Sequence, residues 1–132
     1  MTTSNPSSVL GAGASDKPFN LKVERSPSDA VVRLSGSCTM LVASQLGETL
    51  LRLVSESVRL IIIDMTELDF IESTGLGGIV AGYLRLRRMQ GELRIVGPRP
   101  AIRQLLELTR LTQLFTIHDS VESARKAAPL GR

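Results

Sequence analysis

The sequence predicts an α/β domain whose mixed, mostly parallel sheet has about five strands flanked by about four helices. Short apolar runs with strand character alternate along the chain with longer segments whose apolar residues recur at helical spacing. That alternation is typical of parallel strands joined by right-handed helical crossovers. A chain of 132 residues is long enough for one compact domain, and because only 3% of it is aromatic, its core must be mainly aliphatic.

The first elements should be a hairpin and a helix. Strand-like runs at residues 21–24 and 30–34 are separated by Ser26-Pro27-Ser28-Asp29, in which Pro and Asp favour a turn, so the two strands should pair antiparallel. From residue 43 to about 57, apolar residues recur at helical spacing and form one stripe, which should pack on the sheet. The stripe consists of Leu46, Leu50, Leu53 and Val54.

A buried strand over residues 59–65 should form the centre of the sheet. It contains Leu60-Ile61-Ile62-Ile63, and a run without polar alternation indicates burial on both faces. A second helix should begin where Ser73 or Thr74 supplies the N-cap, and it should end before Gly91. Its buried face is expected to consist of Leu76, Ile79, Val80 and Tyr83.

Two further strands and two further helices should complete the domain in alternating order. Prolines mark the start of the first of these helices, and a short polar side chain should cap the second. The predicted strands cover residues 93–96 and 114–117, and the predicted helices run from Pro98 or Pro100 to about Leu108 and from Val121 to Ala127, the second capped by Asp119 or Ser120.

The domain should occupy residues 18–128, between two tails. Residues 1–17 are rich in Ser, Thr, Gly, Ala and Pro, so they should form a disordered N-terminal tail, and residues 129–132 a C-terminal one. No secretory signal or membrane-length apolar stretch is evident, and a single cysteine, Cys38, suits a reducing compartment. A cytoplasmic protein without membrane insertion is therefore expected, and its oligomeric state stays open.

The most informative segment is residues 64–80, where the predicted central strand leads into a glycine-rich helix. A hydroxyl at a helix N-terminus is a natural phosphate acceptor, because the helix dipole favours an added anion there. The same hydroxyl could simply cap the helix, which is a commoner role for Ser or Thr. The position of Ser73 and Thr74 in the chain does not by itself separate these two interpretations.

This segment resembles the signature of the STAS family, which occurs in bacterial anti-sigma factor antagonists and in the tails of sulfate transporters. The family pattern is roughly Asp-x-Ser-x-x-x-Phe-hydrophobic-Asp-Ser-x-Gly-Leu. The matching positions are Asp64, Thr66, Phe70, Ile71, Glu72, Ser73, Gly75 and Leu76, with Thr66 in place of Ser and Glu72 in place of Asp. A looser resemblance extends over about residues 19–128, and it implies a single STAS-like domain.

The resemblance implies an anti-sigma factor antagonist that works by partner switching. Unphosphorylated, it would bind an anti-sigma factor serine kinase and release a sigma factor; phosphorylation at Ser73, with Thr74 in reserve, would end that binding. The implied partner-binding residues are Glu72, Ser73, Thr74, Gly75, Leu76, Gly77 and Gly78. The alternative is a STAS scaffold or transporter-associated subunit without phosphoryl control. Because Ser37-Cys38-Thr39 follow Gly36 where family antagonists often carry an acidic pair, the choice of partner stays open.

The glycines of this segment have their own interpretations. Gly75 should supply backbone freedom and access at the point where a partner approaches. Gly77, Gly78 and Gly82 should let the helix pack closely on the sheet or on a partner. A nucleotide site is not expected, since neither a Gly-x-Gly-x-x-Gly pattern nor a P-loop pattern is present.

Charge is distributed unevenly around the segment. Residues 60–84 carry a net charge of −4 from four carboxylates and no Lys or Arg, whereas residues 85–110 carry +5 from seven Arg and two Glu. A phosphoryl group on Ser73 should therefore deepen an acidic patch and repel an acidic partner surface.

Neither an enzyme nor a metal or cofactor site is expected. The carboxylates lack accompanying His or Cys ligands, and no motif links His118 to Cys38, a small residue expected to be half-buried. Direct nucleic-acid binding is not expected either, because the arginines follow helical and strand spacing without interleaved aromatic residues.

Overall fold

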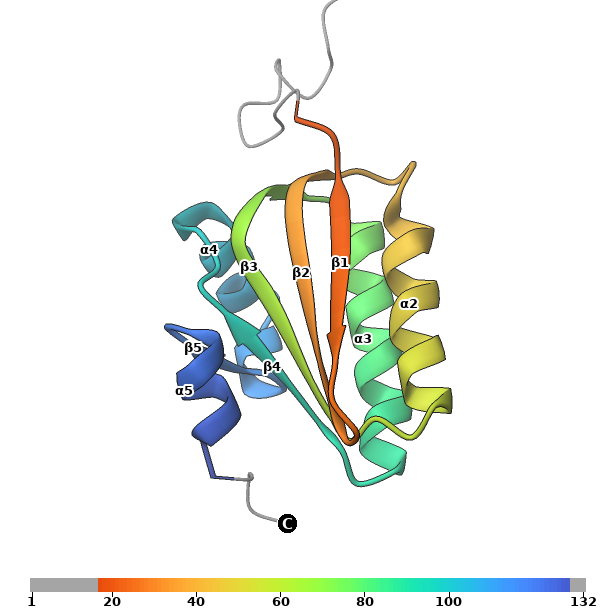
Figure 1. Ribbon diagram of the computed structural model, residues 1–132. Coiled ribbons are helices and arrows are strands. Elements are labelled where there is room, and N and C mark those ends of the chain that lie inside the picture. The colour runs from red at the N-terminus through yellow and green to blue at the C-terminus, as the bar shows by residue number, and fades with distance from the viewer. Residues whose placement is uncertain (1–16, 129–132) are drawn as a thin grey trace, which may run out of the picture.

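Five strands form one sheet in the computed structural model, which describes residues 17–128 (Figure 1). The strands are β1 (Asn20–Arg25), β2 (Asp29–Cys38), β3 (Leu60–Ile71), β4 (Glu92–Val96) and β5 (Thr116–His118). They lie side by side in chain order, with β1 antiparallel to β2 and every later pair parallel. The predicted fold class, a mixed and mostly parallel sheet that opens with a hairpin, is confirmed.

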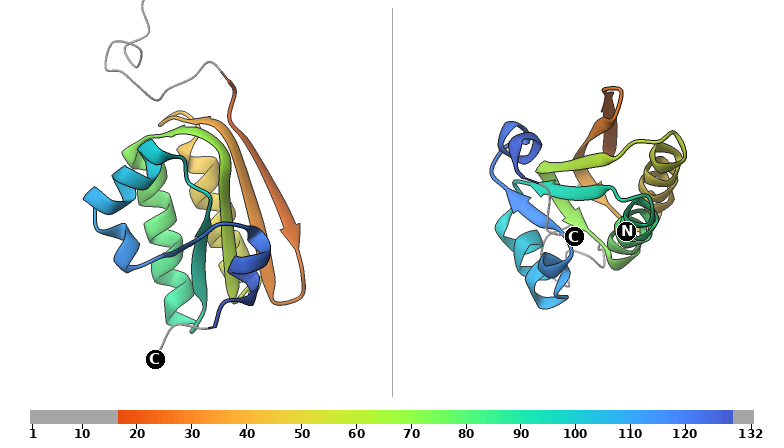
Figure 2. Two further views of the ribbon diagram at one scale, coloured as in Figure 1. Left: turned by 90° about the vertical axis from the view of Figure 1, so that its left-hand side faces the viewer. Right: turned by 90° about the horizontal axis from the view of Figure 1, so that it is seen from below.

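Helices cover both faces of the sheet, but unequally (Figure 2). The helices are α2 (Ala43–Ser55), α3 (Ser73–Arg88), α4 (Pro100–Leu108) and α5 (Val121–Lys126). The first three share the main hydrophobic core with one face of the sheet, whereas α5 packs on the other face against Val31, Ile62 and Val96. Crossovers from one parallel strand to the next therefore place the ends of β2 and β3 at one edge of the molecule, beside the N-termini of α2 and α3 (Figure 1).

The central strand is buried as predicted, but it is longer than predicted. The side chains of Ile61, Ile62 and Ile63 are fully buried, which confirms that both faces of this strand are covered. The strand continues to Ile71 instead of ending at Met65. Two shifts of register against β2 explain the difference, because each adds one residue to β3 and interrupts the alternation of its side chains.

Several other boundaries differ from the prediction. Strand β2 runs past the expected end at Leu34 to Cys38, and Gly36 lies within it at φ +78°, closely packed against the Pro18 carbonyl. A short 3₁₀ turn follows α4, so β5 begins at Thr116 instead of residue 114. Ser120, one of the two expected caps of α5, accepts a hydrogen bond from the Ser123 backbone N–H at 3.0 Å.

The expected tails fall almost entirely outside the described residues. Residues 1–16 and 129–132 are not described, so the boundaries at residues 17–18 and 128–129 stay predictions. Lys17 is the first described residue, and its carbonyl accepts a hydrogen bond from the backbone N–H of Ser37 at 3.3 Å. The chain is thus attached to β2 from Lys17 onward.

Candidate functional site

Ser73 lies on the surface at the edge where β2 and β3 both end. It is the first residue of α3, and both it and Thr74 are exposed. The N-cap is Glu72, whose backbone is extended (φ −86°, ψ 166°) and whose side chain makes no capping hydrogen bond. The expectation that Ser73 or Thr74 caps the helix is therefore wrong, since the chain enters the helix one residue earlier than a hydroxyl cap would require.

Glu72 fastens this junction to the loop that follows β2. Its backbone N–H donates to the carbonyl of Cys38 at 3.0 Å, and its side-chain Oε2 accepts from the backbone N–H of Met40 at 3.2 Å. Its own carbonyl accepts from the N–H of Gly75 at 2.9 Å. Glu72 therefore links the start of α3 to the loop after β2 by hydrogen bonds, and Ser73 is the next residue along this fixed backbone.

Gly75 is required by packing inside the domain. A Cβ at Gly75 would lie 2.8 Å from Cγ1 of Ile71 and 3.0 Å from the sulfur of Cys38. Its φ is not positive, and the residue is buried. The expectation that Gly75 supplies backbone freedom and access for a partner is therefore wrong, because its missing side chain makes room for β2 and β3.

The other glycines of α3 divide into two groups. A Cβ at Gly78 would lie 3.3 Å from the Cα of Gly47, and one at Gly82 would lie 2.9 Å from Cβ of Leu50. Both therefore allow α2 and α3 to pack closely, whereas the prediction was close packing on the sheet or on a partner. Gly77 differs, because a Cβ there would meet no atom within 4 Å.

Gly77 also lies on the same side of α3 as Ser73, one turn further along. Residues four apart on a helix are neighbours on its surface. A glycine within a helix is about 1 kcal/mol less favourable than alanine, and nothing within the described residues offsets that loss at this exposed position. Ser73 and Gly77 together form an exposed surface without large side chains. Leu76, which lies between them in sequence, is buried.

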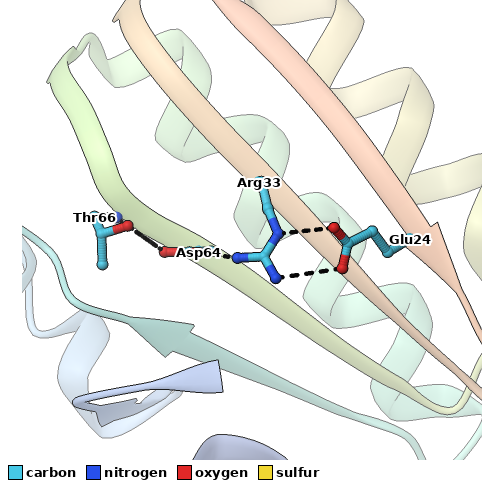
Figure 3. Close-up of polar contacts among 4 residues, drawn as sticks. All are labelled: Glu24, Arg33, Asp64 and Thr66. Carbon is cyan, nitrogen blue, oxygen red and sulfur yellow. Dashed lines mark hydrogen bonds and ion pairs between the residues drawn. The ribbon is translucent and has the colours of Figure 1, made fainter. Parts of the chain in front are cut away.

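Two of the four carboxylates in residues 60–84 pair with arginines from other parts of the chain, which corrects the charge count of that segment. Asp64 accepts from Arg33 at 2.6 Å and from the hydroxyl of Thr66 at 2.8 Å (Figure 3). Asp69 forms an ion pair with Arg99. Counting charges along residues 60–84 missed both arginines, because β2 and the start of α4 bring them in from outside that range.

Arg99 is a site residue that the sequence did not reveal. Its Nε donates to the carbonyl of Thr66 at 3.2 Å, while its guanidinium pairs with Asp69, so Arg99 contacts β3 at both register shifts. No spacing rule connects an arginine at a helix start with a carboxylate thirty residues earlier. Its position after a strand, next to two prolines, was the only available signal.

A protein-family comparison agrees with this geometry, since the model of the STAS domain matches residues 20–124. The chain belongs to the STAS domain family. The matched range begins at the first residue of β1 and ends in α5, so it includes the whole sheet.

Individual relatives of this STAS domain are named as regulators. The anti-sigma-B factor antagonist of Staphylococcus aureus is 28% identical over 106 residues, which cover 79% of this chain and 98% of that protein. A crystal structure of an anti-sigma factor antagonist from Mycobacterium paratuberculosis is 27% identical, with a TM-score of 0.75 over 85% of this chain and 95% of that one.

The fold is shared with more distant structures as well. The Bacillus cell fate determinant SpoIIAA in its phosphorylated form has a TM-score of 0.66 and 20% identity, with 83% of this chain and 98% of that chain covered. At this identity the likeness concerns the fold.

Cys38 is held in the core of the STAS domain, beneath the start of α3. It is fully buried instead of half-buried, with its sulfur facing Gly75. Burial, with a smaller contribution from the carboxylate of Glu72, raises the pKa of the Cys38 thiol to about 11. The thiol is therefore protonated at neutral pH and serves as a small apolar group.

Within residues 17–128 no three His, Cys, Asp or Glu side chains are grouped so that they could hold a metal ion. The same part of the STAS domain contains no helix of the length and apolar character needed to cross a membrane.

Proposed function

We propose that this STAS domain is a cytoplasmic anti-sigma factor antagonist switched by phosphorylation at Ser73. Unphosphorylated, it binds an anti-sigma factor serine kinase, which then releases a sigma factor; phosphorylated, it loses that partner. The observation that carries the proposal is the exposure of Ser73 at the first position of α3, on a junction that Glu72 braces.

The helix position explains how a phosphoryl group can be added without damage to the domain. A helix N-terminus carries a partial positive charge, so a phosphate of charge about −1.5 to −2 is stabilised there. Ser73 is exposed, and no described residue forms a hydrogen bond with its hydroxyl. Phosphorylation of Ser73 therefore leaves the core of the domain unchanged, and it acts on the contact with the partner.

The predicted partner-binding segment divides into contacting and supporting residues. We assign direct contact to the outward-facing Ser73, Thr74 and Gly77. Gly75 and Leu76 support that surface from the core, while Glu72 and Gly78 hold it against the β2–α2 loop and α2. A protein of this fold solved in a phosphorylated form supports the proposal.

The test uses purified anti-sigma factors from the genome that encodes this chain, each incubated with the full chain and Mg-ATP. Mass spectrometry should locate one phosphate on Ser73, and calorimetry should show at least tenfold weaker binding of the modified form. Ser73→Ala should bind and resist modification, whereas Thr74→Ala, the matched control, should remain a substrate.

Two results would count against the proposal in different ways. A phosphate found elsewhere would reject Ser73 as the switch. Equal affinity of the kinase for both forms would leave the scaffold or transporter-associated subunit without phosphoryl control as the better account.

A further inference from the structure

The surface around Ser73 is formed by two stretches of the chain without charge. Residues 34–47 contain no Asp, Glu, Lys, Arg or His, and neither do residues 73–84. The first stretch includes the end of β2, the loop after it and the start of α2; the second forms most of α3. Since 22% of all residues are charged, two adjacent stretches of this length without charge set this end of the domain apart.

The two stretches are in direct contact. Gly78 of α3 faces the Cα of Gly47 in α2 closely enough that a Cβ there would lie at 3.3 Å. At the other end, Glu72 accepts a hydrogen bond from the backbone of Met40 and so uses its carboxylate within the protein. The exposed residues of these two stretches near Ser73 form an uncharged area, which we call the neutral surface. It consists of Met40, Leu41, Ser44, Gln45, Ser73, Thr74 and Gly77.

Two large apolar side chains project from the neutral surface into solvent. Met40 is 63% exposed and Leu41 is 88% exposed, and both lie in the loop that Glu72 fastens beside Ser73. Leu41 has the highest exposure among the large hydrophobic residues of the described chain. Adjacent exposed apolar side chains beside a site of protein contact are typical of anchors that a partner buries.

We infer that the partner of this STAS domain has an uncharged contact surface with an apolar recess that receives Met40 and Leu41. This inference rests on the proposed function and adds the chemistry of the partner. Met40 and Leu41 supply affinity in both phosphorylation states, and Ser73 and Gly77 supply the part that phosphorylation removes.

The neutral surface also changes the physical reason for the switch. Asp69 is paired with Arg99, and the Glu72 carboxylate accepts a hydrogen bond from the Met40 backbone, so the two carboxylates that precede Ser73 most closely in the chain already have partners within the protein. A phosphate that is covered by an uncharged partner surface instead loses its hydration without gaining an ionic partner, and such burial of charge is strongly unfavourable. Release follows from desolvation, not from repulsion between charges.

The first measurement tests the recess with the anti-sigma factor that binds the full chain. Leu41→Ser and Met40→Ser should each weaken binding roughly tenfold to hundredfold, as expected for the burial of one large apolar side chain. The factor should be the same for the unphosphorylated and the phosphorylated form. Leu108→Ser is the matched control, because Leu108 is 74% exposed but lies at the end of α4, outside the neutral surface, and it should leave affinity within twofold.

The second measurement separates desolvation from repulsion by ionic strength. Salt screens repulsion between exposed charges, with a screening length of about 10 Å at 0.1 M and about 3 Å at 1 M. The ratio of affinities before and after phosphorylation should therefore change less than twofold between 0.05 and 1 M NaCl. A ratio that falls severalfold with salt would show a charged partner surface and overturn the inference.

The outcomes distinguish the inference from the function on which it rests. Unchanged affinity in both Leu41→Ser and Met40→Ser, while phosphorylation still weakens binding, would overturn the recess and leave the switch intact. Weaker binding in both variants without any effect of phosphorylation would reject the switch and support the recess. If none of the anti-sigma factors binds the unmodified chain, both are rejected.

Discussion

Glycines along α3 occupy chemically different surroundings although they are the same residue. Gly75 makes room for Ile71 and Cys38, Gly78 makes room for α2, and Gly77 faces open space. Each is therefore expected to respond to the same added methyl group in its own way.

We predict that Gly77→Ala and Gly78→Ala have opposite effects on stability. Gly77→Ala should raise the free energy of unfolding by up to about 1 kcal/mol, because alanine is the better helix former and meets no neighbour. It should nevertheless weaken binding of the anti-sigma factor, since its methyl group enters the proposed contact. Urea denaturation and calorimetry measure the two quantities.

Gly78→Ala is the internal comparison. Its Cβ would approach the backbone of Gly47 at 3.3 Å, so α2 and α3 must separate slightly and the free energy of unfolding should fall. A more stable Gly77→Ala variant with unchanged affinity would show that no partner approaches this position.

The position of Ser73 could be predicted from the sequence, but the surroundings of the neighbouring glycines could not. Its place at a strand-to-helix junction followed from periodicity and the STAS signature. Whether a glycine faces the core, another helix or solvent could not be predicted, because a residue without a side chain contributes nothing to an apolar pattern. The exposure of Met40 and Leu41 could not be predicted either, since two apolar residues before a helix are as consistent with burial as with exposure.

At the scale of elements, strand β3 shows where periodicity stops being informative. The isoleucine run predicted its buried first half, because an uninterrupted apolar stretch has few alternatives. Its second half contains two added residues relative to β2, and each one exchanges the faces to which later side chains point. The mixed pattern from Thr66 to Ile71 therefore does not follow strand alternation.

Helix α5 is short, and a buried arginine holds its C-terminal end. Arg94 of β4 donates to the carbonyl of Ala124 at 2.5 Å and to that of Ala127 at 3.1 Å, while it pairs with Glu92 at 2.6 Å. A cation at this position suits the negative end of a helix.

We predict that Arg94→Met lowers the free energy of unfolding by about 3 kcal/mol and loosens α5. The substitution removes the donor for the buried carbonyl of Ala124 and the part-buried carbonyl of Ala127, and it leaves Glu92, whose side chain is 11% exposed, without this ion-pair partner. Chemical denaturation should report the loss, and hydrogen exchange should become faster in α5 than in α2.

Lys126→Met is the matched control for that experiment. Lys126 also pairs with a glutamate, Glu122, but both side chains are more than 70% exposed, so its loss should change stability by less than about 1 kcal/mol. Equal effects of the two substitutions would show that the burial of Arg94 is energetically irrelevant.

At the scale of the whole molecule, the start of the folded domain can be located by truncation. We predict that removing residues 1–16 shifts the melting temperature by less than about 2 °C, because the hydrogen bond between the Lys17 carbonyl and the Ser37 backbone of β2 is kept in the shortened chain. Removing residues 1–19 should lower it by several degrees, since Phe19 packs against the core. A large fall in melting temperature on removing residues 1–16 would place the start of the folded domain before Lys17.

Strand order equal to chain order has a consequence for synthesis on the ribosome. Each strand pairs with the one made just before it, so no segment has to wait for a distant part of the chain. The hairpin of β1 and β2 can form while β3 is still being translated, and α2 is already present to cover the growing sheet. The domain can therefore assemble in the order of its synthesis, and the neutral surface can be complete once α3 has emerged from the ribosome, before α4 and α5 emerge.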